Sequence, residues 1–209
     1  MTSQSAAPKL LAPKIKIIGV CSDVFNDSKD DIICQIREKN PDIDQLIVNE
    51  DDFKIIFMKK EDNFIVIKTT GRIRELIIEM GNKIYLGLQI LNVHDHIHLI
   101  QCYHCQEFGH YSGSDFCKQK EGRGACFYCA SREHKSSDCR DKRNISRHRC
   151  INCVRDKRSS THHKSADPLC PLVIRETLRM YSRIDGVDPE SKNMYIRMTE
   201  RLRQRRNQA

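Results

Sequence analysis

Hydrophobic residues in the first forty positions predict one strand and one helix. In the run KIKIIGV, residues 14–20, Ile15, Ile17 and Val20 are spaced as in a buried strand. Ser28 and Asp31 then have the spacing of a capping box, and isoleucines on one face follow them. We therefore expect a helix that ends near residues 40–41, where proline follows asparagine.

The next fifty residues predict the rest of a small domain. Strand-like runs at 53–58 and 64–67 flank the polar KKEDN, which predicts a hairpin. Residues 71–81 place apolar side chains at helical spacing, and KIYLGLQILNV, residues 83–93, predicts one last strand. The order strand, helix, strand, strand, helix, strand predicts an α+β fold with the topology of the RNA-recognition motif (RRM).

Function is less directly predicted for this first domain. Its sheet offers Phe64 as a ring for RNA, without the aromatic motif that RRM domains usually carry. We therefore expect a scaffold or protein-contact role, with direct RNA contact as the alternative. Cys21 and Cys34 stand beside apolar positions, so we expect both to be core thiols.

Four segments are expected along the chain. Residues 1–13 predict a flexible tail, and residues 14–100 an RRM-like α+β domain. Residues 101–171 hold most of the cysteines and predict little regular structure. Residues 172–209 predict a basic tail of two short helices, the second of which ends in four arginines.

The localisation follows from what the sequence lacks. The amino-terminal stretch does not have the features of a secretory signal, and no apolar run reaches the length of a membrane span. We expect a cytoplasmic or nuclear protein with no membrane partner. In a reducing compartment, closely spaced cysteines more often bind metal or perform redox chemistry than form disulfides.

The cysteines form a repeated pattern with histidine. Eleven are present, and nine of them fall between residues 102 and 170. They occur with histidines in three consecutive Cys-Cys-His-Cys sets: C-x2-C-x4-H-x6-C, C-x2-C-x4-H-x4-C and C-x2-C-x9-H-x6-C. The expected ligands are Cys102, Cys105, His110 and Cys117; Cys126, Cys129, His134 and Cys139; and Cys150, Cys153, His163 and Cys170, with His162 as the alternative to His163.

Sulfur and imidazole in sets of four are the ligands of a structural Zn²⁺ site. We expect three zinc ions per chain, which supply the order that such short loops cannot gain from apolar burial. A redox pair would not explain the repeats, and disulfides would leave the histidines without a role. His94, His96 and His98 alternate along the last predicted strand, so they are candidates either for a further metal site or for contact with RNA.

Charge distinguishes the two halves of the chain. Residues 1–100 carry 13 basic and 15 acidic side chains, whereas residues 101–209 carry 23 and 13. A basic segment that also holds aromatic residues is typical of proteins that bind single-stranded nucleic acid. For each ring, the alternative is that it only covers the metal site. The expected nucleic-acid contacts are Tyr103, Phe108, Tyr111, Lys118, Lys120, Arg123, Phe127, Tyr128, Arg140, Lys142, Arg143, Arg147 and Arg149.

The cysteine segment and the strand before it resemble a known family. The second set has the spacing of the zinc knuckle of retroviral nucleocapsid proteins. The phrase VHDHIHLIQCYHCQEFGH, residues 93–110, resembles the Gag-like protein from the first open reading frame of arthropod non-LTR retrotransposons. IREKN, GNKIYLG and HKSADPLCP are also similar to that family, so the resemblance covers roughly residues 14–183.

The resemblance implies a function. It implies a non-enzymatic component of a retrotransposon ribonucleoprotein that binds single-stranded RNA or DNA and acts as a nucleic-acid chaperone. Self-association or contact with other Gag-like subunits is a further implied interaction. The alternative is a host zinc-knuckle protein of RNA processing, domesticated from such an element. A zinc hydrolase or deaminase is disfavoured, because the sequence lacks an H-x-E motif followed by a matching cysteine pair.

Overall fold

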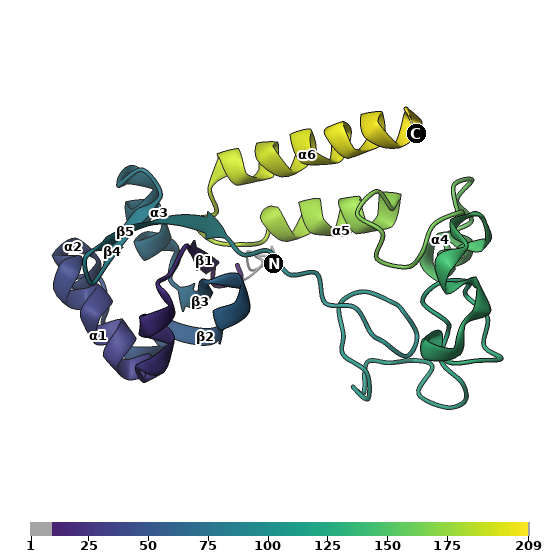
Figure 1. Cartoon of the computed structure of the whole chain (residues 1–209), viewed down its shortest axis with the longest axis horizontal. Coiled ribbons are helices and arrows are strands. Elements are labelled where there is room, and N and C mark those ends of the chain that lie inside the picture. Colours follow the sequence, from purple (N-terminus) through teal and green to yellow (C-terminus); the bar gives the residue numbers. More distant parts are fainter. Residues whose placement is uncertain (1–9, 209) are drawn as a thin grey trace, which may run out of the picture. The chain divides into compact units, whose positions relative to one another are not determined.

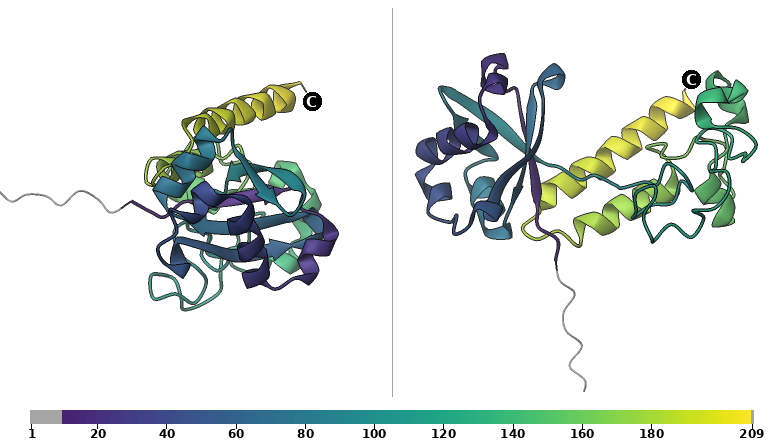
Figure 2. Two further views of the ribbon diagram at one scale, coloured as in Figure 1. Left: turned by 90° about the vertical axis from the view of Figure 1, so that its left-hand side faces the viewer. Right: turned by 90° about the horizontal axis from the view of Figure 1, so that it is seen from below.

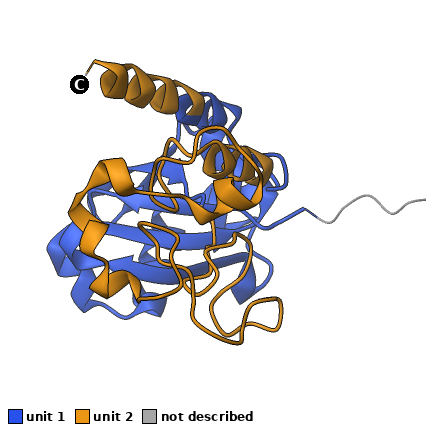
Figure 3. Cartoon of the chain, turned by 90° about the vertical axis from the view of Figure 1, so that its right-hand side faces the viewer, with its two compact units in different colours: residues 1–97, 181–195 blue, residues 98–180, 196–209 orange. Residues whose placement is uncertain are grey.

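The computed structural model describes residues 10–208 (Figure 1). The chain forms two compact units, which Figure 3 shows in different colours. The first comprises Met1–Ile97 with Tyr181–Tyr195, and the second comprises His98–Met180 with Ile196–Ala209. The segment 172–209, expected as one separate tail, is therefore shared between the two units.

The first unit contains a five-stranded antiparallel sheet with the strand order β2-β3-β1-β5-β4. The prediction of a single strand over 83–93 was wrong, because this stretch forms a hairpin that turns at Gly87, where φ is +57°. A positive φ is readily adopted by glycine. The strands are β1 Lys14–Ile18, β2 Phe53–Lys59, β3 Phe64–Thr69, β4 Lys83–Leu86 and β5 Gln89–Asp95.

Both predicted helices of this unit are confirmed. Helix α1, Lys29–Lys39, begins where the Ser28 side chain accepts a hydrogen bond from the Asp31 backbone N–H, at 3.1 Å. Thr70 caps the start of the second in the same way. Such a cap satisfies one of the backbone N–H groups that have no partner within the helix. The helices and 3₁₀ turns of the first unit are η1 Ser22–Asn26, α1, α2 Pro41–Asp44, η2 Glu50–Asp52, η3 Lys60–Asp62 and α3 Gly71–Glu79.

One apolar core joins α1 and α3 to one face of the sheet. Figure 2 gives two further views of the ribbon of these elements. Ile17 of β1 pairs with Ile65 of β3 and with Val93 of β5, and all three are buried. Ile36 of α1 and Ile77 of α3 belong to the same cluster. Each fully buried aliphatic side chain contributes about 1.5–3 kcal/mol, so this core accounts for the order of the unit.

The prediction for two cysteines was wrong. Cys21 and Cys34 are exposed rather than buried. Cys34 lies on α1 away from the buried Ile32 and Ile36, and its Sγ is 3.6 Å from a carboxylate oxygen of Glu38. Both thiols therefore lie outside the core, although apolar residues are next to them in the sequence.

A buried arginine holds the segment 181–195 within the first unit. The side chain of Arg74 is fully buried, and its Nε donates to Asp95 at 2.7 Å. Its Nη1 donates to Asn82, and Asp188 lies 3.8 Å from Nη2. The backbone N–H of Asp188 donates to Asp95 as well, at 3.0 Å. Asp95 of β5 thus accepts hydrogen bonds both from Arg74 of α3 and from the segment 181–195.

The expected tail 1–13 is only partly described, because residues 1–9 lie outside the described part of the chain. Leu11 belongs to the first unit: its N–H donates to Arg183 O at 2.7 Å, and its carbonyl accepts from Asp185 N at 2.9 Å. These two bonds attach Leu11, which precedes β1, to the segment 181–195.

The second unit has no strand among the described residues and only short helices in its cysteine segment. This agrees with the expectation of little regular structure there. Within residues 10–208, no helix combines the length and the apolar character that crossing a membrane requires. The remaining helices and 3₁₀ turns are η4 Ser136–Asp138, η5 Arg140–Arg143, η6 Ile145–Arg147, α4 Ile151–Arg155, α5 Pro171–Tyr181 and α6 Pro189–Asn207, the last of which begins in the first unit.

Candidate metal centres

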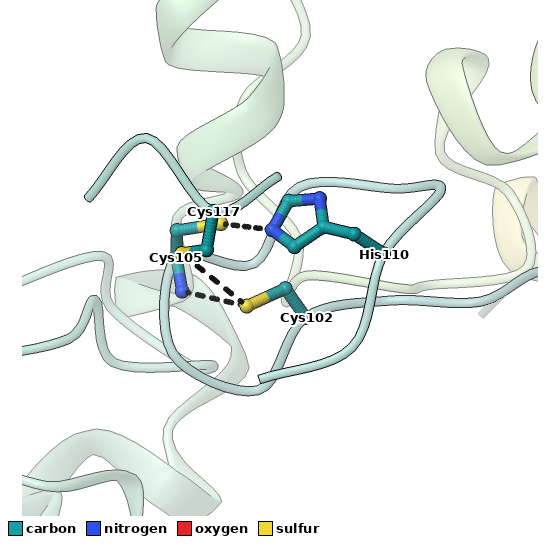
Figure 4. Close-up of side chains that lie close together, drawn as sticks. All are labelled: Cys102, Cys105, His110 and Cys117. Carbon is teal, nitrogen blue, oxygen red and sulfur yellow. Dashed lines mark hydrogen bonds between the residues drawn. The ribbon is translucent and has the colours of Figure 1, made fainter. Parts of the chain in front are cut away.

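The first Cys-Cys-His-Cys set closes around one point. Figure 4 shows its four side chains directed toward one another. Cys102 Sγ and Cys117 Sγ lie 3.9 Å apart, and Cys105 Sγ lies 3.3 Å from Nε2 of His110. All four residues are buried. Residues 15 positions apart in the chain thus present their ligand atoms to one shared site.

The other two sets have the same arrangement. Cys129 Sγ lies 3.4 Å from His134 Nε2 in the second set. In the third, Cys153 Sγ lies 3.5 Å from His163 Nε2, whereas His162 is exposed and outside the cluster. The structure therefore favours His163 of the two candidates. In each set the four ligand atoms lie within 4.8 Å of one another.

These distances fit a tetrahedral metal ion. Zinc–sulfur bonds of about 2.3 Å at tetrahedral angles place two sulfurs about 3.8 Å apart, close to the 3.9 Å between Cys102 and Cys117. Cys129 and Cys139 are similarly spaced, at 3.8 Å. A disulfide would require about 2.0 Å, and all eleven cysteines are free. Each set can therefore hold one metal ion through three sulfurs and one imidazole nitrogen.

Tight turns bring the first two cysteines of a set together. In the first set, Cys102 N donates to Glu107 O and Gln106 N donates back to Cys102 O, both at 2.8 Å. Gln106, directly after the second cysteine, has a φ of +66°. Ala130 holds the equivalent position in the second set and has a φ of +64°. This left-handed residue turns the chain so that both sulfurs face the same point.

One cysteine of each set has a lowered pKa. Burial raises the pKa of Cys102, but hydrogen bonds from the backbone N–H groups of Cys105 and His104 outweigh this and lower it to about 6. A hydrogen bond from Cys170 lowers the pKa of Cys150 to about 4 and raises the pKa of Cys170 itself.

Burial raises the pKa of the neighbouring Cys105 to about 12, and the charge of Cys102 adds to this effect. One thiolate in a set thus opposes the ionisation of the next. A divalent cation offsets that repulsion because its positive charge lies next to each thiolate, and metal binding then displaces the remaining thiol protons. The donor set therefore fits a cation that prefers several thiolates, which is typical of zinc.

The three sets are bonded to one another inside the second unit. Ala125 N, just before the second set, donates to His104 O in the first at 2.8 Å. Gly124 makes this approach possible, because a Cβ there would lie 2.6 Å from His104 O. Ser165 N of the third set donates to Phe127 O of the second at 2.9 Å.

The first and third sets also meet directly. Asn152 of α4 donates through its side chain to Gln106 O at 2.6 Å. Arg155 donates to Cys105 O at 2.8 Å and to the Gln119 side chain at 3.0 Å. The cysteine segment is therefore one bonded assembly and not three independent loops.

The aromatic residues expected to contact nucleic acid have different surroundings. Tyr103 is 81% exposed and Tyr111 is 62% exposed. Phe127 and Tyr128 are half-buried, with ring centroids 5.2 Å apart. Phe108 instead packs against the cluster formed by the third set and Leu172, so its ring contributes to packing between the sets.

All eight basic side chains expected to contact nucleic acid are exposed. Three of them are engaged: Lys120 pairs with Asp115, Arg147 pairs with Asp141, and Arg123 donates to Glu133 O. The other five, for which the described part of the chain shows no side-chain partner, are Lys118, Arg140, Lys142, Arg143 and Arg149.

Sequence reasoning missed Gln106, Asn152 and Arg155, which connect the first and third sets. No spacing or composition signal distinguished these side chains from other polar residues. It also missed Phe116, which is 81% exposed. Among the described residues, no cluster of three or more potential ligands includes His94, His96 or His98.

No family model, curated protein or solved structure matches this chain.

Proposed function

We propose that this protein binds single-stranded nucleic acid through three zinc-ordered knuckles. The observation that carries the proposal is the closure of three complete Cys₃His sets within one basic unit. Because short loops of this kind bury little apolar surface, the metal would supply most of their folding free energy.

The proposed metal role is structural rather than catalytic. A catalytic zinc keeps one coordination position open for water or substrate. Each set here provides four protein ligand atoms within 4.8 Å of one another, which is the full complement of a structural zinc. We therefore propose a binding protein and not an enzyme.

Single-stranded nucleic acid suits the exposed chemistry of the second unit. Unpaired bases stack on exposed rings, and cations neutralise the backbone phosphates. Tyr103 and Tyr111 are exposed in the first set, and the linker between the second and third sets presents Arg140, Lys142 and Arg143 to solvent. A duplex hides its base faces, so we expect weaker binding to duplexes.

The proposed biological role is that of a Gag-like subunit that coats retrotransposon RNA and promotes its annealing during reverse transcription. It is supported by the sequence resemblance over residues 93–110, where the last strand leads directly into the first knuckle. Contacts with further copies of the chain would follow from such a role.

We propose that the first unit is related to the RRM fold and serves as a scaffold. In support, four of its strands lie in the order β2-β3-β1-β5, and α1 and α3 belong to one core with a single sheet face. On the opposite face, Phe64 is only 7% exposed and Lys16 Nζ lies 3.8 Å from its ring centroid. That ring is therefore poorly placed to stack on a base.

The test is fluorescence anisotropy of a labelled eight-nucleotide single-stranded RNA with the full chain under reducing conditions. We expect binding with zinc, loss of binding after chelation, and recovery when zinc is returned. A duplex of the same sequence is the control and should bind more weakly. Binding that persists after complete chelation would refute the proposal.

A further inference from the structure

A groove lies between the first and second knuckles, within the second unit. It has two adjoining parts, of about 600 Å³ and about 470 Å³, and both are lined by Tyr103 and Ser136. His104 and Arg123 line the larger part, and Lys142 lines the smaller. Beside the groove, the hydrogen bond from Ala125 N to His104 O joins the two knuckles, and His104, Gly124 and Ala125 all line the larger part.

Aromatic rings line the smaller part. Tyr103 is 81% exposed, so one face of its ring is available to a ligand. Phe127 and Tyr128 also line this part and pack edge to face at 5.2 Å. Tyr128 also packs against the buried ring of His148, with centroids 5.6 Å apart. These contacts keep two rings of the groove in place before a ligand arrives.

A buried acceptor without a partner lies beside these rings. The amide nitrogen of Gln106 donates to Tyr103 O at 2.9 Å and to Ala125 O at 3.2 Å. These two bonds fix the orientation of the amide. Gln106 is 1% exposed and lines the groove, and its Oε1 has no hydrogen-bond partner in the described structure. A buried acceptor without a partner costs free energy. A ligand that brings an N–H group to it removes this cost, which favours binding.

We propose that this groove is the binding site for one unpaired nucleotide whose base stacks on Tyr103 and donates an amino N–H to Oε1 of Gln106. The side chains of Lys142 and Arg123 supply positive charge for the adjoining phosphates. This inference rests on the proposed function. It adds where a nucleotide binds and that its base must carry an amino group. Rings, a buried acceptor and cations together match a nucleotide, whereas an acidic peptide would leave the rings unused.

The first test compares Tyr103→Ala with Phe116→Ala. Both rings belong to the first knuckle and both are 81% exposed, but Phe116 does not line the groove. Each variant should retain three zinc ions, because neither ring is a ligand. We expect Tyr103→Ala to weaken binding of the single-stranded octamer about 5- to 100-fold, and Phe116→Ala to change it less than about threefold. Equal losses of RNA affinity in the two variants would show that the base does not stack on Tyr103 in this groove.

The second test examines the amino group. Wild-type protein is titrated with an octamer of adenosine and with the same octamer made from purine riboside, which lacks only the amino group. We expect the purine riboside octamer to bind about 5- to 100-fold more weakly, because Oε1 of Gln106 again lacks a donor. Equal affinity would overturn the hydrogen bond to Gln106. Failure of both octamers to bind would instead refute the proposed function itself, so the two failures are distinguishable.

Discussion

The guanidinium of Arg155 donates a hydrogen bond of 2.8 Å to the backbone carbonyl of Cys105. Arg155 is the last residue of α4 in the third knuckle, and Cys105 belongs to the Cys₃His set of the first. The same side chain reaches Gln119 and Glu107. We therefore expect metal binding at the first knuckle to depend on a side chain of the third.

Replacement of Arg155 tests this dependence. Arg155→Met keeps most of the aliphatic part of the side chain but removes the guanidinium and its partly buried hydrogen bonds to the first knuckle. We expect zinc binding at the first site to become less favourable by about 1–2 kcal/mol. This corresponds to about a 5- to 30-fold weaker zinc affinity. Competition with a chromogenic chelator measures it. Arg158→Met is the control: the side chain of Arg158 pairs with Asp156, and in the described part of the chain only its backbone N–H, which the substitution keeps, bonds to a residue of the third set. Identical curves for the two variants would contradict the coupling.

Adjacent histidines provide a matched test of the third site. His163 lies in the cluster and is 6% exposed, whereas His162 is exposed. His163→Ala removes one of four ligands, so we expect a chain that retains two tightly bound zinc ions. His162→Ala should retain three, as measured by elemental analysis after gel filtration. If the His162 variant were the one that lost zinc, the ligand assignment would be wrong.

The buried arginine of the first unit provides a stability test. Arg74→Met leaves the carboxylate of Asp95 buried without its cation, and such a change costs about 3–5 kcal/mol. We expect faster amide hydrogen exchange in β5 and in residues 181–195, measured by mass spectrometry of peptides. Arg72→Met, at an exposed position on the same helix, should leave exchange nearly unchanged. Unaltered exchange in the Arg74 variant would show that the ion pair does not hold this segment.

Lysine replacement tests phosphate contact. On a single strand, each neutralised phosphate contributes about −0.7 to the slope of log affinity against log salt. Lys142→Gln should therefore reduce the steepness of that slope by about 0.7. Lys39→Gln, an exposed lysine of the first unit, should leave the slope unchanged. The measurement is RNA-binding anisotropy over a salt series, and an unchanged slope for Lys142→Gln would remove this residue from the interface.

The local elements of the fold were predictable from the sequence because they depend on short-range patterns. The cap at Ser28 and the alternating isoleucines of β1 determine their elements without distant contacts. The hairpin at Gly87 was missed because a continuous apolar run does not reveal one residue with positive φ. The return of residues 181–195 to the first unit depends on Arg74 and Asp188, which are more than a hundred positions apart, so no local pattern indicates it.

The grouping of the cysteines and histidines into three sets was predictable for a related reason. Their spacing along the chain is itself the constraint that lets short loops close on one ion. The roles of Phe108 and Gln106 were not predictable, because both depend on which knuckle lies against which. A ring between two ligands can face solvent or the neighbouring knuckle, and only the three-dimensional arrangement distinguishes these cases.

Native mass spectrometry of the full chain with a single-stranded RNA octamer tests the central claim most directly, because one spectrum reports both bound zinc and bound RNA. We predict that the RNA-bound species carries three zinc ions and that chains without zinc carry no RNA. Zinc-free chains that bind the octamer as readily as loaded ones would contradict the account.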